Sequence, residues 1–102
     1  MASLFVLYKK PADTAAFDRY YFEKHIPLAK TIPGLRRYTV TKGPIMTPSG
    51  PSDLHLIANL EFDSMAAIQA AFASAEGRAA AADVQKFATG GAHIMMSEIQ
   101  AV

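Results

Sequence analysis

Hydrophobic and polar residues follow a β-strand spacing in four short segments of the chain. The alternation is clearest from Leu54 to Phe62, where every second residue is apolar and shares one face of the strand. The first segment is apolar almost without alternation, which is typical of a strand covered on both faces. The pattern therefore predicts strands at residues 3–9, 35–42, 54–62 and 93–100.

A period of three and four residues marks an aromatic helix after the first strand. Phe17, Tyr20, Tyr21 and His25 recur on one face of a helix that we expect over residues 14–25. Pro27 cannot donate a hydrogen bond and disfavours helical geometry in the residue before it. We therefore expect this helix to kink or end near the histidine.

The second half of the chain predicts two more helices and one long loop. Ser64 is a good N-cap for a helix over residues 65–73, and a further helix is expected over 78–87. The small residues and glycine at 74–77 predict a break between them. Residues 43–53 contain three prolines and two glycines and predict a loop longer than an ordinary hairpin turn.

The resulting order is β-α-β-β-α-β with one extra helix, which is the ferredoxin-like pattern of an α+β fold. It predicts one domain over residues 1–102, with a four-stranded antiparallel sheet and helices on one face. The other face stays bare although its residues are not uniformly polar. Two such sheets packed face to face would form a dimeric α/β barrel, so we expect a homodimer.

Composition narrows the possible functions. The chain is 51% hydrophobic with a formal net charge of +1, which gives no basic surface for nucleic acid. No apolar run approaches the roughly 20 residues of a membrane span, and the N-terminus lacks a basic region ahead of its apolar stretch. We expect a cytoplasmic protein. The absence of cysteine excludes disulfides and thiolate chemistry, and no nucleotide-binding or phosphate-binding glycine motif is present.

His25 is the leading candidate for chemistry, because imidazole transfers protons near neutral pH. Tyr20 and Tyr21 are close to it on the helix, and Asp83 is a candidate acid/base partner on the inner edge of the third helix. The competing interpretation is that the histidine is structural and packs between aromatic rings. His55 and His93 could join His25 in a three-histidine metal site, but their spacing matches no metal motif, so we predict no metal.

Several short motifs together resemble the EthD family, which is named for ethyl tert-butyl ether degradation. They are Phe17 to Lys30 with its His-x-Pro, Ile32-Pro33-Gly34-Leu35, Ala58 to Met65, Ala73 to Gly77, Ala82-Asp83 and Phe87 to Gly91. The resemblance covers nearly the whole chain. It implies a dimeric α/β barrel with a cavity between sheet and helices, in a superfamily that includes cofactor-independent monooxygenases, isomerases and cyclases.

The resemblance leaves two functional hypotheses open. The first is a cofactor-independent enzyme acting on a small hydrophobic or aromatic metabolite, with His25 and Asp83 as catalytic residues. The second is a non-catalytic binding or accessory protein for such a metabolite in a degradation pathway. Under both hypotheses the ligand-binding candidates are four aromatic residues, namely Tyr20, Tyr21, Tyr38 and Phe87.

Overall fold

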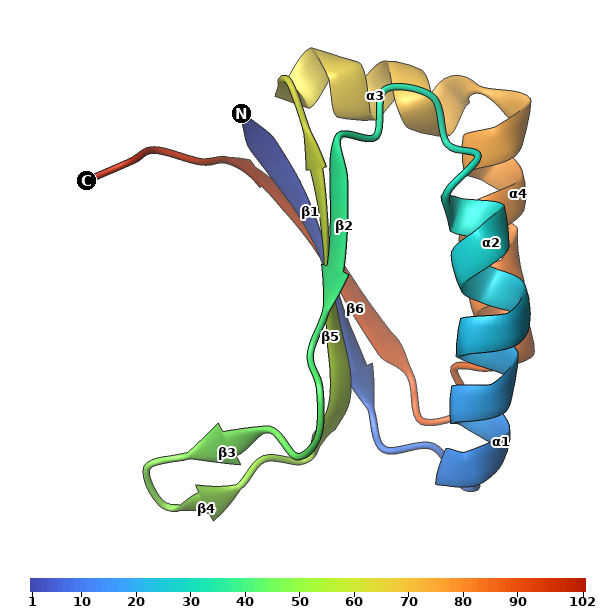
Figure 1. The fold of residues 1–102 in the computed structure, drawn as a ribbon, viewed down its shortest axis with the longest axis vertical. Coiled ribbons are helices and arrows are strands. Elements are labelled where there is room, and N and C mark those ends of the chain that lie inside the picture. The colour runs from blue at the N-terminus through green and yellow to red at the C-terminus, as the bar shows by residue number, and fades with distance from the viewer.

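The computed structural model describes residues 1–102 and has the predicted order of elements. Four antiparallel strands form one sheet in the order β2-β5-β1-β6, and the helices cover one of its faces (Figure 1). The strands are β1 (Ala2–Lys9), β2 (Arg37–Val40), β5 (Leu54–Phe62) and β6 (Ala92–Glu98). The predicted α+β ferredoxin-like sheet is confirmed, with β2 shorter than expected at both ends.

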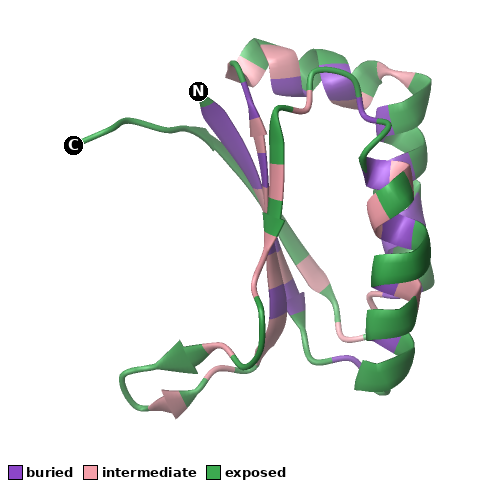
Figure 2. Cartoon of the chain, viewed as in Figure 1, coloured by how far each residue is buried: buried purple, intermediate pink, exposed green.

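The core lies between the sheet and the helices. Leu4, Val6 and Tyr8 of β1 pair with alternate residues of β5 and point toward the helices, where all three are buried. Figure 2 shows buried positions along the central strands and in the helices that cover the sheet. One continuous cluster of 17 buried apolar residues joins both layers. The site described below is built into this layer.

The aromatic helix continues through Pro27 instead of ending before it. α1 (Thr14–Tyr20) is followed by a π-helical turn, η1 (Tyr21–His25), and then by α2 (Ile26–Ala29). The amide of Ile26 donates to the carbonyl of Tyr21, five residues back. The wider turn gives the proline ring space that an α-helical turn denies it. The expected kink at His25 is therefore a π-turn inside a longer helix.

The expected break between the two helices is present but shorter than residues 74–77, because Ser74 alone has extended backbone. α3 (Met65–Ala73) begins at the predicted N-cap Ser64, but α4 (Ala75–Asp83) starts directly after Ser74, whose side chain accepts from the amide of Gly77. A Cβ at Gly77 would lie 2.0 Å from the carbonyl oxygen of Ala71. The glycine therefore allows two helices to approach closely rather than ending one of them. α4 is followed directly by a 3₁₀ turn, η2 (Val84–Lys86).

The predicted loop at residues 43–53 contains a small hairpin. β3 (Met46–Thr47) pairs with β4 (Gly50–Pro51), and the hairpin projects away from the sheet and its helices (Figure 1). The tight turn at Pro48-Ser49 permits this pairing. The proline and glycine content of the segment predicted a loop and did not indicate the hairpin. None of the helices combines the length and apolar character that a membrane crossing requires.

The second face of the sheet carries no helix and is partly apolar. Phe5 and Leu7 of β1 point to this face. Leu7 pairs with Ile57 of β5, and Phe5 pairs with Met95 of β6. Met95 is about half exposed. An apolar face of this kind is a feature of sheets that pack against a second layer.

Candidate functional site

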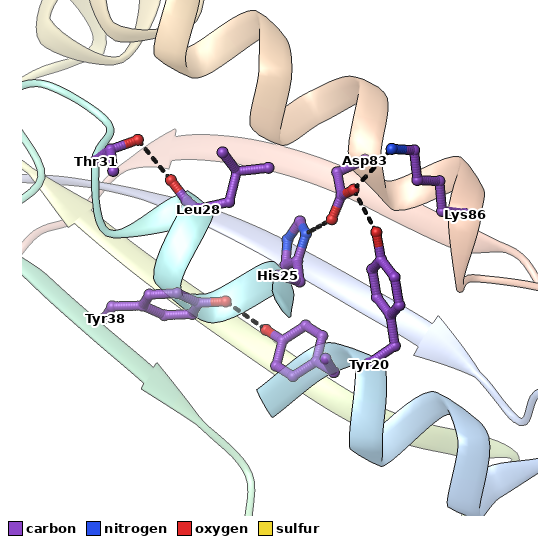
Figure 3. A network of polar contacts seen from close by, with 8 residues as sticks. Tyr20, His25, Leu28, Thr31, Tyr38, Asp83 and Lys86 are labelled. Carbon is purple, nitrogen blue, oxygen red and sulfur yellow. Dashed lines mark hydrogen bonds and ion pairs between the residues drawn. The ribbon is translucent and has the colours of Figure 1, made fainter. Parts of the chain in front are cut away.

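A histidine and an aspartate meet inside the layer between the helices and the sheet. His25 comes from the π-turn η1, and Asp83 is the last residue of α4. Their side chains are joined by a 3.0 Å contact between Nδ1 and Oδ2, and each residue is only 5% exposed (Figure 3). The two residues that the sequence pointed to as an acid/base pair are thus brought together from segments 58 positions apart.

Asp83 is held as a carboxylate by its neighbours. Burial alone would raise its pKa, but hydrogen bonds from His25 and Tyr20 outweigh this effect and hold the pKa of Asp83 below its usual value. The Tyr20 hydroxyl donates to Oδ1 at 2.8 Å, and the ammonium group of Lys86 lies 3.7 Å from the same oxygen (Figure 3). The carboxylate is therefore available to accept a hydrogen bond from Nδ1–H of the histidine.

His25 is held as a neutral imidazole. Burial lowers its pKa, although the hydrogen bond and the charge of Asp83 act in the opposite direction. The ring stacks on Tyr21, with centroids 5.3 Å apart, and its centroid lies 4.7 Å from that of Phe87. With Nδ1–H directed at the carboxylate, the lone pair of the ring is on Nε2, which has no hydrogen-bond partner in the protein.

An apolar cavity of about 140 Å³ adjoins the pair, between the sheet and the helices. Its walls come from β1, β2, β5 and β6 on one side and from the helical segments on the other. His25 is part of the wall, and the lining is otherwise hydrophobic or aromatic. Ile94 and Met96 of β6 also line the cavity yet are 49% and 43% exposed. The cavity therefore opens to solvent beside the edge strand β6.

Tyrosine hydroxyls are the other polar groups of this cavity. The hydroxyls of Tyr21 and Tyr38 lie 2.6 Å apart, so one of them donates a hydrogen bond to the other (Figure 3). The accepting hydroxyl keeps a proton that it can donate to another group. Burial raises the pKa of both residues, which keeps them protonated at neutral pH. Tyr8 also lines the cavity, although it was not among the predicted site residues. The one signal in the sequence was its polar-tipped side chain at the end of an apolar strand.

Not every predicted site residue reaches the cavity wall. Tyr21 and Tyr38 line it, as expected of ligand-binding residues, whereas Tyr20 and Phe87 lie behind the His25–Asp83 pair. Tyr20 orients the aspartate, and Phe87 packs against the imidazole and the rings around it. Their expected direct contact with a ligand gives way to a supporting position.

The other two histidines lie away from this site. His93 pairs with Leu7 and points to the bare face of the sheet, and no group of three His, Cys, Asp or Glu residues is placed to hold a metal ion. His55 instead contacts Asp18 of α1, with Nε2 2.7 Å from Oδ1. This second pair lines an open cleft of about 720 Å³ between the aromatic helix and the segment around the hairpin.

The arrangement at His25 is suited to proton transfer. A neutral imidazole can accept a proton at Nε2, and the carboxylate on Nδ1–H stabilises the resulting cation. A small ligand in the apolar cavity would lie against the wall that His25 helps to form, with most water excluded.

Comparison with known proteins identifies the family. The model of the EthD domain matches residues 9–91. The chain belongs to the EthD family. A Rhodococcus erythropolis relative, described as an uncharacterized 11.0 kDa protein in the thcB-thcC intergenic region, is 41% identical over 95% of this chain and 93% of its own length. An EthD family protein from Bacillus halodurans is 37% identical, with a TM-score of 0.91 over 98% of this chain and 99% of that one.

More distant structures share the fold of this EthD chain. SnoaB from Streptomyces nogalater, a cofactor-independent oxygenase, is 13% identical with a TM-score of 0.69 over 99% of this chain and 94% of its own. A dimeric protein of ferredoxin-like fold from Bacteroides fragilis is 18% identical with a TM-score of 0.63, over 96% of this chain and 95% of that one. At these identities the likeness shows the fold alone.

Proposed function

We propose that this protein is a cofactor-independent enzyme that acts on a small hydrophobic or aromatic metabolite, with His25 as its acid/base. One observation carries the proposal. A buried imidazole, hydrogen-bonded to a buried carboxylate at 3.0 Å, forms part of the wall of an apolar cavity. Membership of the EthD family and the fold shared with a cofactor-independent oxygenase are consistent with it.

The proposed step is removal of a proton from a carbon or hydroxyl group of the ligand. Nε2 of His25 takes the proton, and the electron pair stays on the ligand as an enolate or phenolate. Asp83 holds Nδ1–H and balances the positive charge of the imidazolium. Return of the proton to another atom of the ligand gives an isomerase. Attack of the enolate carbon on a second carbonyl group of the ligand, whose oxygen then takes the proton, gives a cyclase. Addition of dioxygen to the carbanion gives a hydroperoxide once the proton returns, and loss of water from it leaves a carbonyl group, which is the product of a monooxygenase.

Hydrogen exchange tests the step without knowledge of the substrate. Single-ring ketones and phenols would be incubated with the protein in D₂O, and the loss of their C–H signals would be followed by proton NMR. We expect His25→Asn, whose amide still donates to Asp83, to slow the catalysed exchange by at least about 100-fold.

Lys24→Gln is the matched control, since Lys24 is an exposed neighbour on the same helical segment. It should exchange ligand protons at the wild-type rate. A His25→Asn protein that catalyses exchange as fast as the wild type would exclude His25 as the base.

The second candidate is a binding or accessory protein for the same kind of ligand. The almost entirely apolar lining favours it, because such a cavity binds apolar molecules without any proton transfer. Ligand-dependent thermal stabilisation that survives His25→Asn, with no exchange on any compound of the panel, would favour this function over the first.

We further propose that the protein acts as a homodimer through the bare face of its sheet. Phe5 and Leu7 would be covered by the same residues of a second copy. Sedimentation equilibrium should give a dimer at micromolar concentration, and Phe5→Glu should shift it toward monomer. A monomeric wild-type protein under those conditions would contradict the proposal.

A further inference from the structure

Tyr8 is the buried polar residue that the His25 mechanism leaves unused. It is 1% exposed, it lies on the helix-facing side of β1, and it lines the apolar cavity. Three aromatic rings surround its own, those of Phe17, Tyr21 and Phe87, with centroids 5.3 to 5.6 Å away. Packing therefore fixes the direction of the phenol group.

The Tyr8 hydroxyl has no hydrogen-bond partner in the protein, unlike those of the other three tyrosines. Only one side-chain polar atom, Oδ1 of Asn59, is both fully shielded from solvent and without a hydrogen-bond partner. The Tyr8 hydroxyl therefore keeps some open space next to it, and the cavity is the open space that the residue lines. A buried hydroxyl without a partner costs free energy unless something supplies an acceptor or donor there.

The surroundings of Tyr8 favour donation over ionisation. Burial raises its pKa well above the usual value for tyrosine, and the nearby Tyr38 and Asp83 raise it further. The phenol is therefore protonated at any physiological pH. The rings of Tyr21 and Phe87 pack against both Tyr8 and His25, which places Tyr8 at the same end of the cavity as the imidazole.

We propose that the cavity binds compact apolar molecules that carry one carbonyl oxygen, and that the hydroxyl of Tyr8 donates a hydrogen bond to this oxygen. The Tyr21–Tyr38 pair supplies one more free proton beside it. The cavity of about 140 Å³ sets the size of the ligand. An apolar cavity of about 150 Å³ in another protein binds benzene, so the ligand is close to a single six-membered ring.

This proposal deepens the proposed function and rests on it for the chemistry. When His25 removes a proton beside the carbonyl, the electron pair of the C–H bond moves to the oxygen and forms an enolate. The Tyr8 O–H is already directed at that oxygen and stabilises its negative charge. The proton returns from the imidazolium to carbon, so no oxidant or other reactant is needed.

The test compares two ligands of almost the same shape, cyclohexanone and methylenecyclohexane, by calorimetric titration. The wild-type protein should bind the ketone about five- to ten-fold more tightly, the worth of one hydrogen bond to a neutral group. In Tyr8→Phe the preference for the ketone should disappear, while the affinity for the hydrocarbon stays the same. Lys24→Gln, which changes an exposed side chain outside the cavity, should keep the preference for the ketone.

A spectroscopic signature separates hydrogen bonding from packing. The carbonyl carbon of bound ¹³C-labelled cyclohexanone should resonate further downfield in the wild type than in Tyr8→Phe, where its oxygen has lost the donor. Equal loss of affinity for both ligands would make Tyr8 a packing residue and overturn the proposal, as would an unchanged preference in the variant. Ketone preference without hydrogen exchange would refute the acid/base function and leave the binding site intact.

Discussion

Two histidine–aspartate pairs lie on the helix side of this sheet, and only one of them is a candidate site. The His55–Asp18 contact is the shorter, at 2.7 Å against 3.0 Å for His25–Asp83. The difference lies in burial, because the side chains of the first pair are 18% and 51% exposed, and those of the second are 7% and 6% exposed. Short distance alone is therefore a poor guide to function.

Solvent accounts for the contrast. A surface pair is screened by water and contributes little, whereas a buried pair changes the proton affinity of each member and must be supported by further groups. Asp83 has that support from Tyr20 and Lys86. Asp18 has no comparable second contact, and its cleft is wide and open. The candidate site is thus distinguished by its surroundings rather than by its residue types.

Replacing the two aspartates separately should give the largest effect. Asp83→Asn keeps the shape of the side chain but removes the charge that stabilises the imidazolium, so we expect a loss of at least about 100-fold in the exchange rate of a bound ketone. Asp18→Asn should change that rate by less than about two-fold from the wild-type value, which is about the accuracy of the measurement. Equal losses of exchange rate in the two variants would show that the buried pair has no special role in the reaction.

Stability should separate the pairs next. His25→Leu leaves the buried carboxylate of Asp83 without its main partner, which we expect to lower the free energy of unfolding by about 2–3 kcal/mol. His55→Leu removes a partly exposed contact and should cost about 1 kcal/mol or less. Urea unfolding at one fixed protein concentration measures both, since a dimer would make the midpoint depend on concentration. A larger loss in His55→Leu would reverse the assignment.

Most of the fold was predictable because it follows from local rules. The strand at Leu54–Phe62 and the helix after Ser64 have the expected bounds, since alternation and an N-cap act within a few residues. The helix bounds around Gly77 and Pro27 were harder to predict, because both residues oppose a helix by intrinsic preference. Gly77 lies inside a helix because two helices approach closely there, and Pro27 lies inside one because a π-turn precedes it.

The site was predictable in part. His25, Tyr21 and Tyr20 share one helical stretch, so their spacing exposed them as a group. Asp83 was selected by its place on the third helix, and its contact with the histidine depends on how α4 packs against the aromatic helix. Tyr8 was missed because its role depends on the empty space next to its hydroxyl, and no periodicity in the sequence reports a cavity.

The pH dependence of stability should follow the buried histidine. Because burial lowers the pKa of His25, the unfolded chain binds the proton more readily than the folded protein does. The stability is therefore fully present above the ordinary histidine pKa of about 6.5 and is lost as the pH falls through the lower folded value. Urea unfolding between pH 8 and pH 5, by about half-unit steps, should show this decline. His25→Asn should remove that part of the slope, and a slope unchanged in the variant would assign it to another group.

The smallest effect we expect is a change in the pH profile caused by Tyr20→Phe. Tyr20 donates to Oδ1 of Asp83 and thereby withdraws part of the negative charge that the imidazole senses through Oδ2. Without this hydroxyl the carboxylate becomes a stronger partner for the imidazolium, so the pKa of His25 should rise. The acidic limb of kcat/KM for ketone exchange should move to higher pH, while the rate on the alkaline plateau falls only a few-fold.

His55→Asn is the matched comparison for this last effect, because it changes the other pair and leaves every contact of Asp83 in place. Its acidic limb should coincide with that of the wild type. A Tyr20→Phe limb that moves to lower pH, or one that does not move, would show that Tyr20 does not act on His25 through Asp83. The Tyr20 hydroxyl would then be a structural contact between its helix and α4, and burial and Asp83 would set the pKa of His25 without it.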